Sequence, residues 1–183
     1  MDLNADLGES FGRWTLGDDA ALMAHITSAN VAAGFHGGDP HVLRETVALA
    51  VENGVGIGAH AGLPDLVGFG RRRMAITPQE LADLVLYQAG AVRAFAEVAG
   101  AELRHVKPHG AMYSMVVDDP ELAAALCETV AGLGVALLMP LQLAGAAAAA
   151  GIRFVPGDIF KLYLAAGLLP GAWKIVERIK RAR

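Results

Sequence analysis

The sequence has a single cysteine, Cys127, and lacks any excess of basic residues. One cysteine excludes an internal disulfide and also a zinc site built from several cysteines. The 15 lysines and arginines stand against 19 aspartates and glutamates, which gives a net charge of −4. A general nucleic-acid binder is usually basic overall, so we expect no nucleic acid among the partners of this chain.

Residues 1–6 also lack the basic and apolar regions of a signal peptide, and we therefore expect a cytoplasmic protein. What the sequence does have is a 54% share of hydrophobic residues, which excludes an intrinsically disordered chain. Its 183 residues are typical of one globular domain with a sizeable core. Because a complete (β/α)8 barrel takes about 250 residues, any barrel in this chain is expected to be incomplete.

Short apolar runs alternate with longer segments of helical periodicity. We expect strands over 2–4, 29–34, 55–59, 103–107, 134–139 and 152–155, and helices from near 17, over 40–52, 77–100, 118–131 and 141–150. This alternation is typical of a parallel α/β sheet that is buried on both faces. We count about six β/α steps.

The C-terminal segment differs from the rest of the chain in charge. Residues 158–183 carry six basic and two acidic residues, whereas residues 1–157 carry nine basic and 17 acidic ones. We therefore divide the chain into a β/α portion, 1–157, and a basic tail, 158–183, with expected helices over 159–169 and 172–183. The tail is too short and too charged for a membrane span. It can lie on a membrane surface as an amphipathic helix or plug the open side of the barrel.

Polar side chains gather close to the ends of the expected strands. They are Asp2, Asn4, Asp6 and Glu9 in and after the first strand, His36 and Asp39 after the second, His60 after the third, and Lys107 and His109 at and after the end of the fourth. The carboxyl ends of parallel strands form one rim, where the active sites of such proteins lie. We therefore expect these side chains to converge.

Three histidines, His36, His60 and His109, each stand within two residues of a glycine at this rim. With Asp6 or Asp39 they can bind a divalent metal, because imidazole and carboxylate suit zinc or a similar ion. They can equally act without metal as general acids and bases near neutral pH, and the spacing does not choose between the two. Packing or surface roles are expected for the remaining histidines, His25, His41 and His105.

Two basic side chains are further candidates. Lys107 ends a buried strand and can neutralise a carboxylate or a developing oxyanion, the structural alternative being an ion pair with Asp6. Arg71 lies in the segment 68–73, which has two glycines and three arginines but matches neither a P-loop nor a dinucleotide fingerprint. It can bind a carboxylate, or the segment can be a solvated basic loop.

Five segments together resemble the LamB/YcsF family: residues 2–9, 28–40, 58–65, 68–72 and 105–113. Their order and spacing make the set far more specific than any single motif, and the resemblance covers residues 1 to about 156. It implies an irregular parallel β/α barrel of the glycoside hydrolase/deacetylase type. Members of that superfamily often bind a metal through Asp and His, which agrees with a divalent ion at His36, His60 and His109.

The family supplies the A subunit of bacterial 5-oxoprolinase. The resemblance therefore implies a hydrolase that opens the cyclic amide of 5-oxoproline to glutamate, with ATP and with subunits B and C as partners. Because the chain has no nucleotide-phosphate loop, activation by ATP is expected on a partner. The expected catalytic residues are Asp6, Glu9, Lys107 and His109, and the expected substrate-binding residues are Asn4, Asn30, Asp39 and Arg71.

After residue 156 the sequence departs from the family pattern. The family has an acidic segment there, followed by further β/α steps, and one of those steps carries a His-Gly-Asp loop. Residues 157–183 show neither. Two alternatives therefore accompany the main interpretation. One is a metal-dependent, deacetylase-like hydrolase that works alone, and the other is a non-catalytic remnant that only binds the other subunits or a small ligand.

Overall fold

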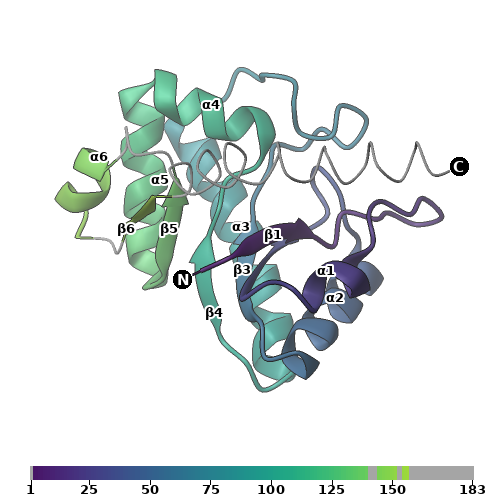
Figure 1. Ribbon diagram of the computed structural model, residues 1–183. Coiled ribbons are helices and arrows are strands. Elements are labelled where there is room, and N and C mark those ends of the chain that lie inside the picture. Colours follow the sequence, from purple (N-terminus) through teal and green to yellow (C-terminus); the bar gives the residue numbers. More distant parts are fainter. Residues whose placement is uncertain (1, 140–143, 152–153, 157–183) are drawn as a thin grey trace, which may run out of the picture.

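The structure is a computed structural model, and it describes residues 2–139, 144–151 and 154–156. A six-stranded parallel sheet forms its centre, and the strands lie in the order of the sequence. They are β1 (Asn4–Leu7), β2 (Ser28–Ala32), β3 (Gly56–His60), β4 (Leu103–Val106), β5 (Ala136–Met139) and β6 (Phe154–Pro156). The ribbon in Figure 1 runs through them from purple to yellow.

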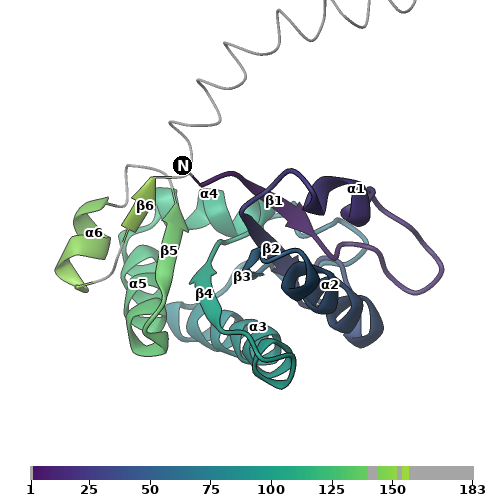
Figure 2. The same ribbon diagram turned by 60° about the horizontal axis from the view of Figure 1, so that its bottom comes forward.

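Helices connect the strands. They are α1 (Asp19–Met23), α2 (Pro40–Glu52), α3 (Pro78–Val98), α4 (Gly110–Asp118), α5 (Pro120–Leu133) and α6 (Ala144–Ala149). Figure 2 shows α2, α3 and α5 side by side along one face of the sheet. Among the described residues, no helix combines the length and the apolar character needed to cross a membrane.

The three long helices begin where the sequence predicts. Asp39 caps α2, Asp119 caps α5, and each carboxylate accepts two backbone N–H groups of the first turn. Thr77 and Glu80 form a capping box at the start of α3. Proline follows each cap at the first helical position, where its missing N–H costs nothing. The predicted range of 40–52 for α2 is confirmed.

Helix α4 has no counterpart among the helices expected from the sequence. Its N-cap residue, His109, makes no side-chain capping bond, and Gly110 follows with a φ of +55°. The sequence therefore lacks the usual signals for the start of a helix at this position. Of the other expected elements, the tail helices over 159–169 and 172–183 lie outside the described residues, as do positions 140–143 and 152–153.

The two faces of the sheet differ in chemistry. Side chains of one face pack against the helices and form the apolar core, which includes Leu7, Val31, Ile57, Val106, Leu43, Val47, Leu81, Val85, Leu126 and Val130. Because successive strand residues point to opposite faces, the residues between them line the other face. There the side chains are polar, since Asn4, Asp6, Asn30, His105 and Lys107 form a hydrogen-bonded layer.

The order of the strands is that of a β/α barrel. Strands β1 and β6 are the two edges of the sheet in the part of the chain that the structure describes, and neither pairs with the other there. These residues hold six strands of an open barrel, the first five of them followed by a described helix, which agrees with the sequence prediction of about six β/α steps. The carboxyl ends of β1 to β4 meet on one rim, and this rim carries the candidate site.

Candidate functional site

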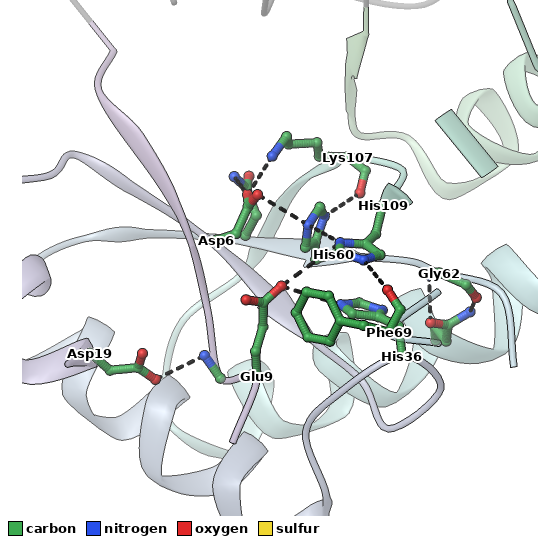
Figure 3. A network of polar contacts seen from close by, with 12 residues as sticks. Asp6, Glu9, Asp19, His36, His60, Gly62, Phe69, Lys107 and His109 are labelled. Carbon is green, nitrogen blue, oxygen red and sulfur yellow. Dashed lines mark hydrogen bonds and ion pairs between the residues drawn. The ribbon is translucent and has the colours of Figure 1, made fainter. Parts of the chain in front are cut away.

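Three histidine rings meet on this rim. His60 is the last residue of β3, His109 is the N-cap of α4, and His36 lies in the loop between β2 and α2. The rings of His36 and His109 stack with centroids 3.7 Å apart, and that of His60 stands edge-on 4.8 Å from His109. Glu9, from the loop after β1, completes a group of four residues whose ligand atoms lie within 4.8 Å of one another (Figure 3).

Backbone carbonyls orient two of these rings. His60 donates Nδ1–H to the carbonyl of Lys107 over 2.8 Å, and His109 donates Nε2–H to the carbonyl of Phe69 over 2.8 Å. Each ring therefore turns its other nitrogen towards its neighbour, and these two atoms are 3.0 Å apart. Burial, with the nearby charges of His36 and His60, lowers the pKa of His109 to about 4. Because both N–H groups bound to carbonyls point away from this contact, the two facing nitrogens are the ones that a cation between the rings would bind.

His36 has the least satisfied side chain of the group. It is 0% exposed, and neither ring nitrogen has a hydrogen-bond partner among the described residues. Its Nε2 lies 3.6 Å from Oε1 of Glu9. Burial lowers the pKa of His36, which favours the neutral, metal-binding form. A buried polar group without a partner costs about 1–3 kcal/mol, so His36 also points to a bound ligand.

The donor set fits a divalent cation. Three imidazoles and one carboxylate are ligands that zinc and similar ions accept, and the carbonyl acceptors behind His60 and His109 are typical of metal-binding histidines. Glu9 supplies the carboxylate of this group, rather than Asp6 or Asp39. Gly62 makes the arrangement possible, because a Cβ there would lie 2.4 Å from Nδ1 of His36.

Asp6 and Lys107 form an ion pair beside the cluster. Oδ2 of Asp6 also lies 3.4 Å from Nε2 of His60. Burial by itself raises the pKa of Asp6. The hydrogen bond and charge of His60, together with the charge of Lys107, outweigh this and hold the pKa well below its usual range. The ionised Asp6 thus holds the Lys107 ammonium at the rim, as the structural alternative for Lys107 predicts.

Asn30 links Asp6 to a histidine for which the sequence predicts a packing or surface role. Its amide donates to Oδ1 of Asn4 over 3.0 Å and to Oδ1 of Asp6 over 2.8 Å. Its own oxygen accepts from Nε2 of His105 over 2.7 Å. Burial lowers the pKa of His105 to about 4, so the ring is a neutral single donor on this side. The sequence does hold a sign of this role for His105. The residue lies two positions before Lys107, and this spacing puts both side chains on one face of β4.

Asp39 lies outside the cluster. Its Oδ1 accepts the backbone N–H groups of His41 and Val42, and its Oδ2 accepts that of Gly12 over 2.8 Å. Both carboxylate oxygens thus accept hydrogen bonds from backbone N–H groups, and Asp39 joins the start of α2 to the loop after β1. The expected pairing of Asp39 with the three histidines does not occur in the described structure.

The three arginines of the segment 68–73 have three different environments. Arg71 is exposed, and its guanidinium carbon lies 5.3 Å from the ring centroid of Phe69, which borders His36 and His109. Arg72 pairs with Asp65 and lowers the pKa of that carboxyl to about 2. Arg73 lies 2.7 Å from Asp118. Among these arginines Arg71 is the one that stands beside the cluster.

Known proteins resemble this chain in sequence and in fold. The chain matches the LamB/YcsF family over residues 1–160. The chain belongs to the LamB/YcsF family. A relative from Bordetella pertussis, named as the A subunit of 5-oxoprolinase, is 57% identical over 130 residues, which cover 71% of this chain and 52% of the relative. A relative of the same name from Nocardia farcinica is 54% identical over 159 residues, which cover 85% and 64%.

A solved structure agrees with this membership. The crystal structure of a lactam utilization protein from Thermus thermophilus superposes with a TM-score of 0.82 at 46% identity. The match covers 85% of this LamB/YcsF chain and 64% of the other. The chain thus spans between about half and two thirds of the length of the relatives it matches.

Proposed function

We propose that this chain is the A subunit of a cytoplasmic 5-oxoprolinase, which opens 5-oxoproline to L-glutamate with ATP and with subunits B and C. The observation that carries the proposal is the joining of a Glu9–histidine cluster to the Asp6–Lys107 pair on the rim of a LamB/YcsF fold. Relatives named as A subunits of 5-oxoprolinase support it.

The roles of the side chains follow from the chemistry of the lactam. Its amide is stable, and ATP supplies the activation, which we assign to a partner because this sequence has no nucleotide-phosphate loop. Lys107, held by Asp6, would stabilise the oxyanion that develops when water attacks the activated carbonyl. Asp6, held ionised beside Lys107, can orient the water, and Glu9 presents a carboxylate that can accept its proton. Arg71, exposed above Phe69, would bind the substrate carboxylate.

Glu9, His36, His60 and His109 would hold a divalent metal at this site. Such an ion supplies Lewis-acid stabilisation of negative charge on oxygen. The chain's own contribution is to fix the ligand atoms. The carbonyls of Lys107 and Phe69 set the orientation of His60 and His109, and burial keeps His36 and His109 neutral.

The test is turnover in the reconstituted complex. With subunits B and C added, we expect 5-oxoproline-dependent ATP hydrolysis, and we expect Lys107→Ala or His109→Ala to lower it by about a hundredfold or more. Arg73→Ala is the matched control, because it removes an exposed ion pair with Asp118 away from the rim and should leave the rate nearly unchanged. Near wild-type turnover of Lys107→Ala would contradict the assignment.

The cluster also favours a second candidate, a metal-dependent hydrolase of the deacetylase type that works alone. Bound zinc by elemental analysis, with amide hydrolysis that requires neither ATP nor partners, would select it. Co-purification with subunits B and C without turnover would instead select a binding role without catalysis.

A further inference from the structure

None of the roles proposed above uses the buried carboxylate of Asp65. Its side chain is 4% exposed, and the residue lies in the loop between β3 and α3. Oδ1 accepts the backbone N–H of Gly68 over 2.9 Å, and Oδ2 accepts that of Arg72 over 3.3 Å. The guanidinium of Arg72 donates to both oxygens. Asp65 therefore holds the two ends of the segment 68–72 together.

The backbone of this loop forms a turn with an unusual residue at its left-handed position. Gly70 donates its N–H to the carbonyl of Asp65 over 2.8 Å, and Phe69 donates its N–H to that of Leu66 over 3.2 Å. This pair of bonds is typical of a Schellman turn, in which the left-handed residue is usually glycine. Here it is Phe69, with a φ of +54°. A bulky side chain is strained in this region, and such strain persists where the surrounding contacts enforce it, most often at functional sites.

The turn directs two carbonyls at the start of α4. That of Phe69 accepts Nε2–H of His109 over 2.8 Å, and that of Gly70 accepts the N–H of Ala111 over 2.9 Å. Because His109 makes no capping bond of its own, the second contact satisfies an N–H group that the first helical turn leaves unpaired. The loop thus fixes both the ring of His109 and the helix start that carries it.

The turn also packs tightly against the histidine cluster. A Cβ at Gly70 would lie 2.7 Å from Cβ of His36 and 2.9 Å from Cδ2 of His109. The ring of Phe69 stands edge-on to both imidazoles, with centroids 5.7 Å from His36 and 5.0 Å from His109. Figure 3 shows this ring beside the histidines and the carbonyl of Phe69 joined to His109. A displacement of the turn would therefore displace the cluster.

We propose that Asp65 is a positioning residue of the cluster, which fixes the tautomer and orientation of His109 through the turn 65–70. The inference rests on the cation site of the proposed function and extends it from the ligands to the loop that sets them.

The effect of removing the carboxylate follows from these contacts. The turn would lose the bonds that hold Gly68 and Arg72, and Phe69 would relax towards negative φ. Its carbonyl would then leave Nε2 of His109, and the ring could carry its proton on Nδ1 instead. Nδ1 is the nitrogen that faces His60, and a protonated Nδ1 cannot bind a cation.

The first test is the tautomer of His109, read by nitrogen NMR in the metal-free full chain at mildly alkaline pH and assigned by its loss in His109→Gln. We expect the Nε2–H tautomer alone in the unaltered chain and a mixture of tautomers in Asp65→Ala. Asp65→Asn is the milder variant, because its amide oxygen can still accept the N–H of Gly68 while the charge that holds Arg72 is gone. It keeps the inference testable if Asp65→Ala does not fold.

The second test is the dissociation constant for zinc, measured by titration calorimetry. We expect Asp65→Ala to weaken zinc binding by about 10–100-fold, as loss of an outer contact of a metal ligand does, and Asp65→Asn to weaken it less. The matched control is Asp118→Asn. That carboxylate pairs with Arg73, next to Arg72 in the sequence, but it is 56% exposed and holds no part of the turn. The control should change neither the tautomer nor the affinity.

A single Nε2–H tautomer in both Asp65 variants would overturn the inference, even if their thermal stability falls, because Asp65 would then be structural only. Unchanged zinc affinity in both, or the same changes in Asp118→Asn, would also overturn it. These outcomes leave the proposed function standing if the unaltered chain binds zinc. If that chain binds no zinc while the tautomer responds to both Asp65 variants, the cation site fails and the positioning role of Asp65 stands.

Discussion

Asn30 is the residue that ties the polar face of the sheet together. Its side chain joins Asn4 and Asp6 on β1 to His105 on β4 across the width of three strand spacings. Strand β3 lies between β2 and β4, and the contact passes over it because Gly58 has no side chain. The position of Asp6, and with it that of Lys107, thus depends on a glycine that carries no chemistry of its own.

Gly58→Ala should therefore break this network. The new Cβ would lie 1.9 Å from Nε2 of His105, so the ring must leave Asn30. We expect the free energy of unfolding to fall by about 1–3 kcal/mol, measured by urea denaturation. The matched control is Gly90→Ala in α3, where a Cβ meets no atom within 4 Å. That change should stabilise the helix by up to about 1 kcal/mol, and equal effects of the two substitutions would contradict the argument.

At the scale of elements, a residue that caps a helix can also position a loop of the site. Asp39 and Asp119 cap α2 and α5 in the same way, each accepting two backbone N–H groups of the first turn. Asp39 also uses its second oxygen to hold another loop, through Gly12. One carboxylate thus starts a helix and anchors the small hairpin in which Phe11 and Trp14 exchange two backbone hydrogen bonds of 2.9 Å.

Asp39→Ala and Asp119→Ala separate these two effects. Each should lower the free energy of unfolding by about 1 kcal/mol through the lost cap. Asp39→Ala alone should also loosen the hairpin around Trp14. The readout is increased acrylamide quenching of Trp14, in a chain whose second tryptophan is removed by Trp173→Phe. Increased quenching in both variants, or in neither, would show that the Gly12 contact does not hold the hairpin.

At the scale of the whole molecule, the rim gathers loops that are far apart in the sequence. Glu9, His36, His60 and His109 follow or end four successive strands, so a metal bound by them would link β1 to β4. Binding to the folded state alone stabilises the whole molecule, by about 2.7 kcal/mol at a metal concentration a hundred times the dissociation constant.

We expect zinc to raise the midpoint of thermal unfolding by about 5–10 °C and excess EDTA to reverse the rise, measured by differential scanning calorimetry. His36→Ala should abolish the response, because it removes a ligand. His41→Ala is the matched control, since His41 is an exposed histidine on α2 outside the cluster. An unchanged midpoint with zinc, or a response that survives His36→Ala, would show that the cluster is not a metal site.

The sequence by itself determined the elements whose signals are local. Caps and prolines marked the starts of α2, α3 and α5, and apolar runs marked the strands, because capping and periodicity depend on neighbouring residues. The parallel arrangement of the strands also followed from the sequence. It led to the expectation that His36, His60 and His109 converge, because the carboxyl ends of parallel strands share one rim. The family motifs pointed to the same residues.

Only the tertiary structure decided which side chains face one another. Glu9 rather than Asp39 completes the cluster, because loop conformation turns Asp39 towards the backbone of Gly12 and α2. His105 joins the polar layer because β4 directs alternate residues inward and Gly58 leaves room across the sheet. An apolar cavity of about 380 Å³ beside Glu9 and His36 arises between the loop after β1 and the loop after β3, which are more than forty residues apart. Contacts between such distant segments leave no local pattern in the sequence.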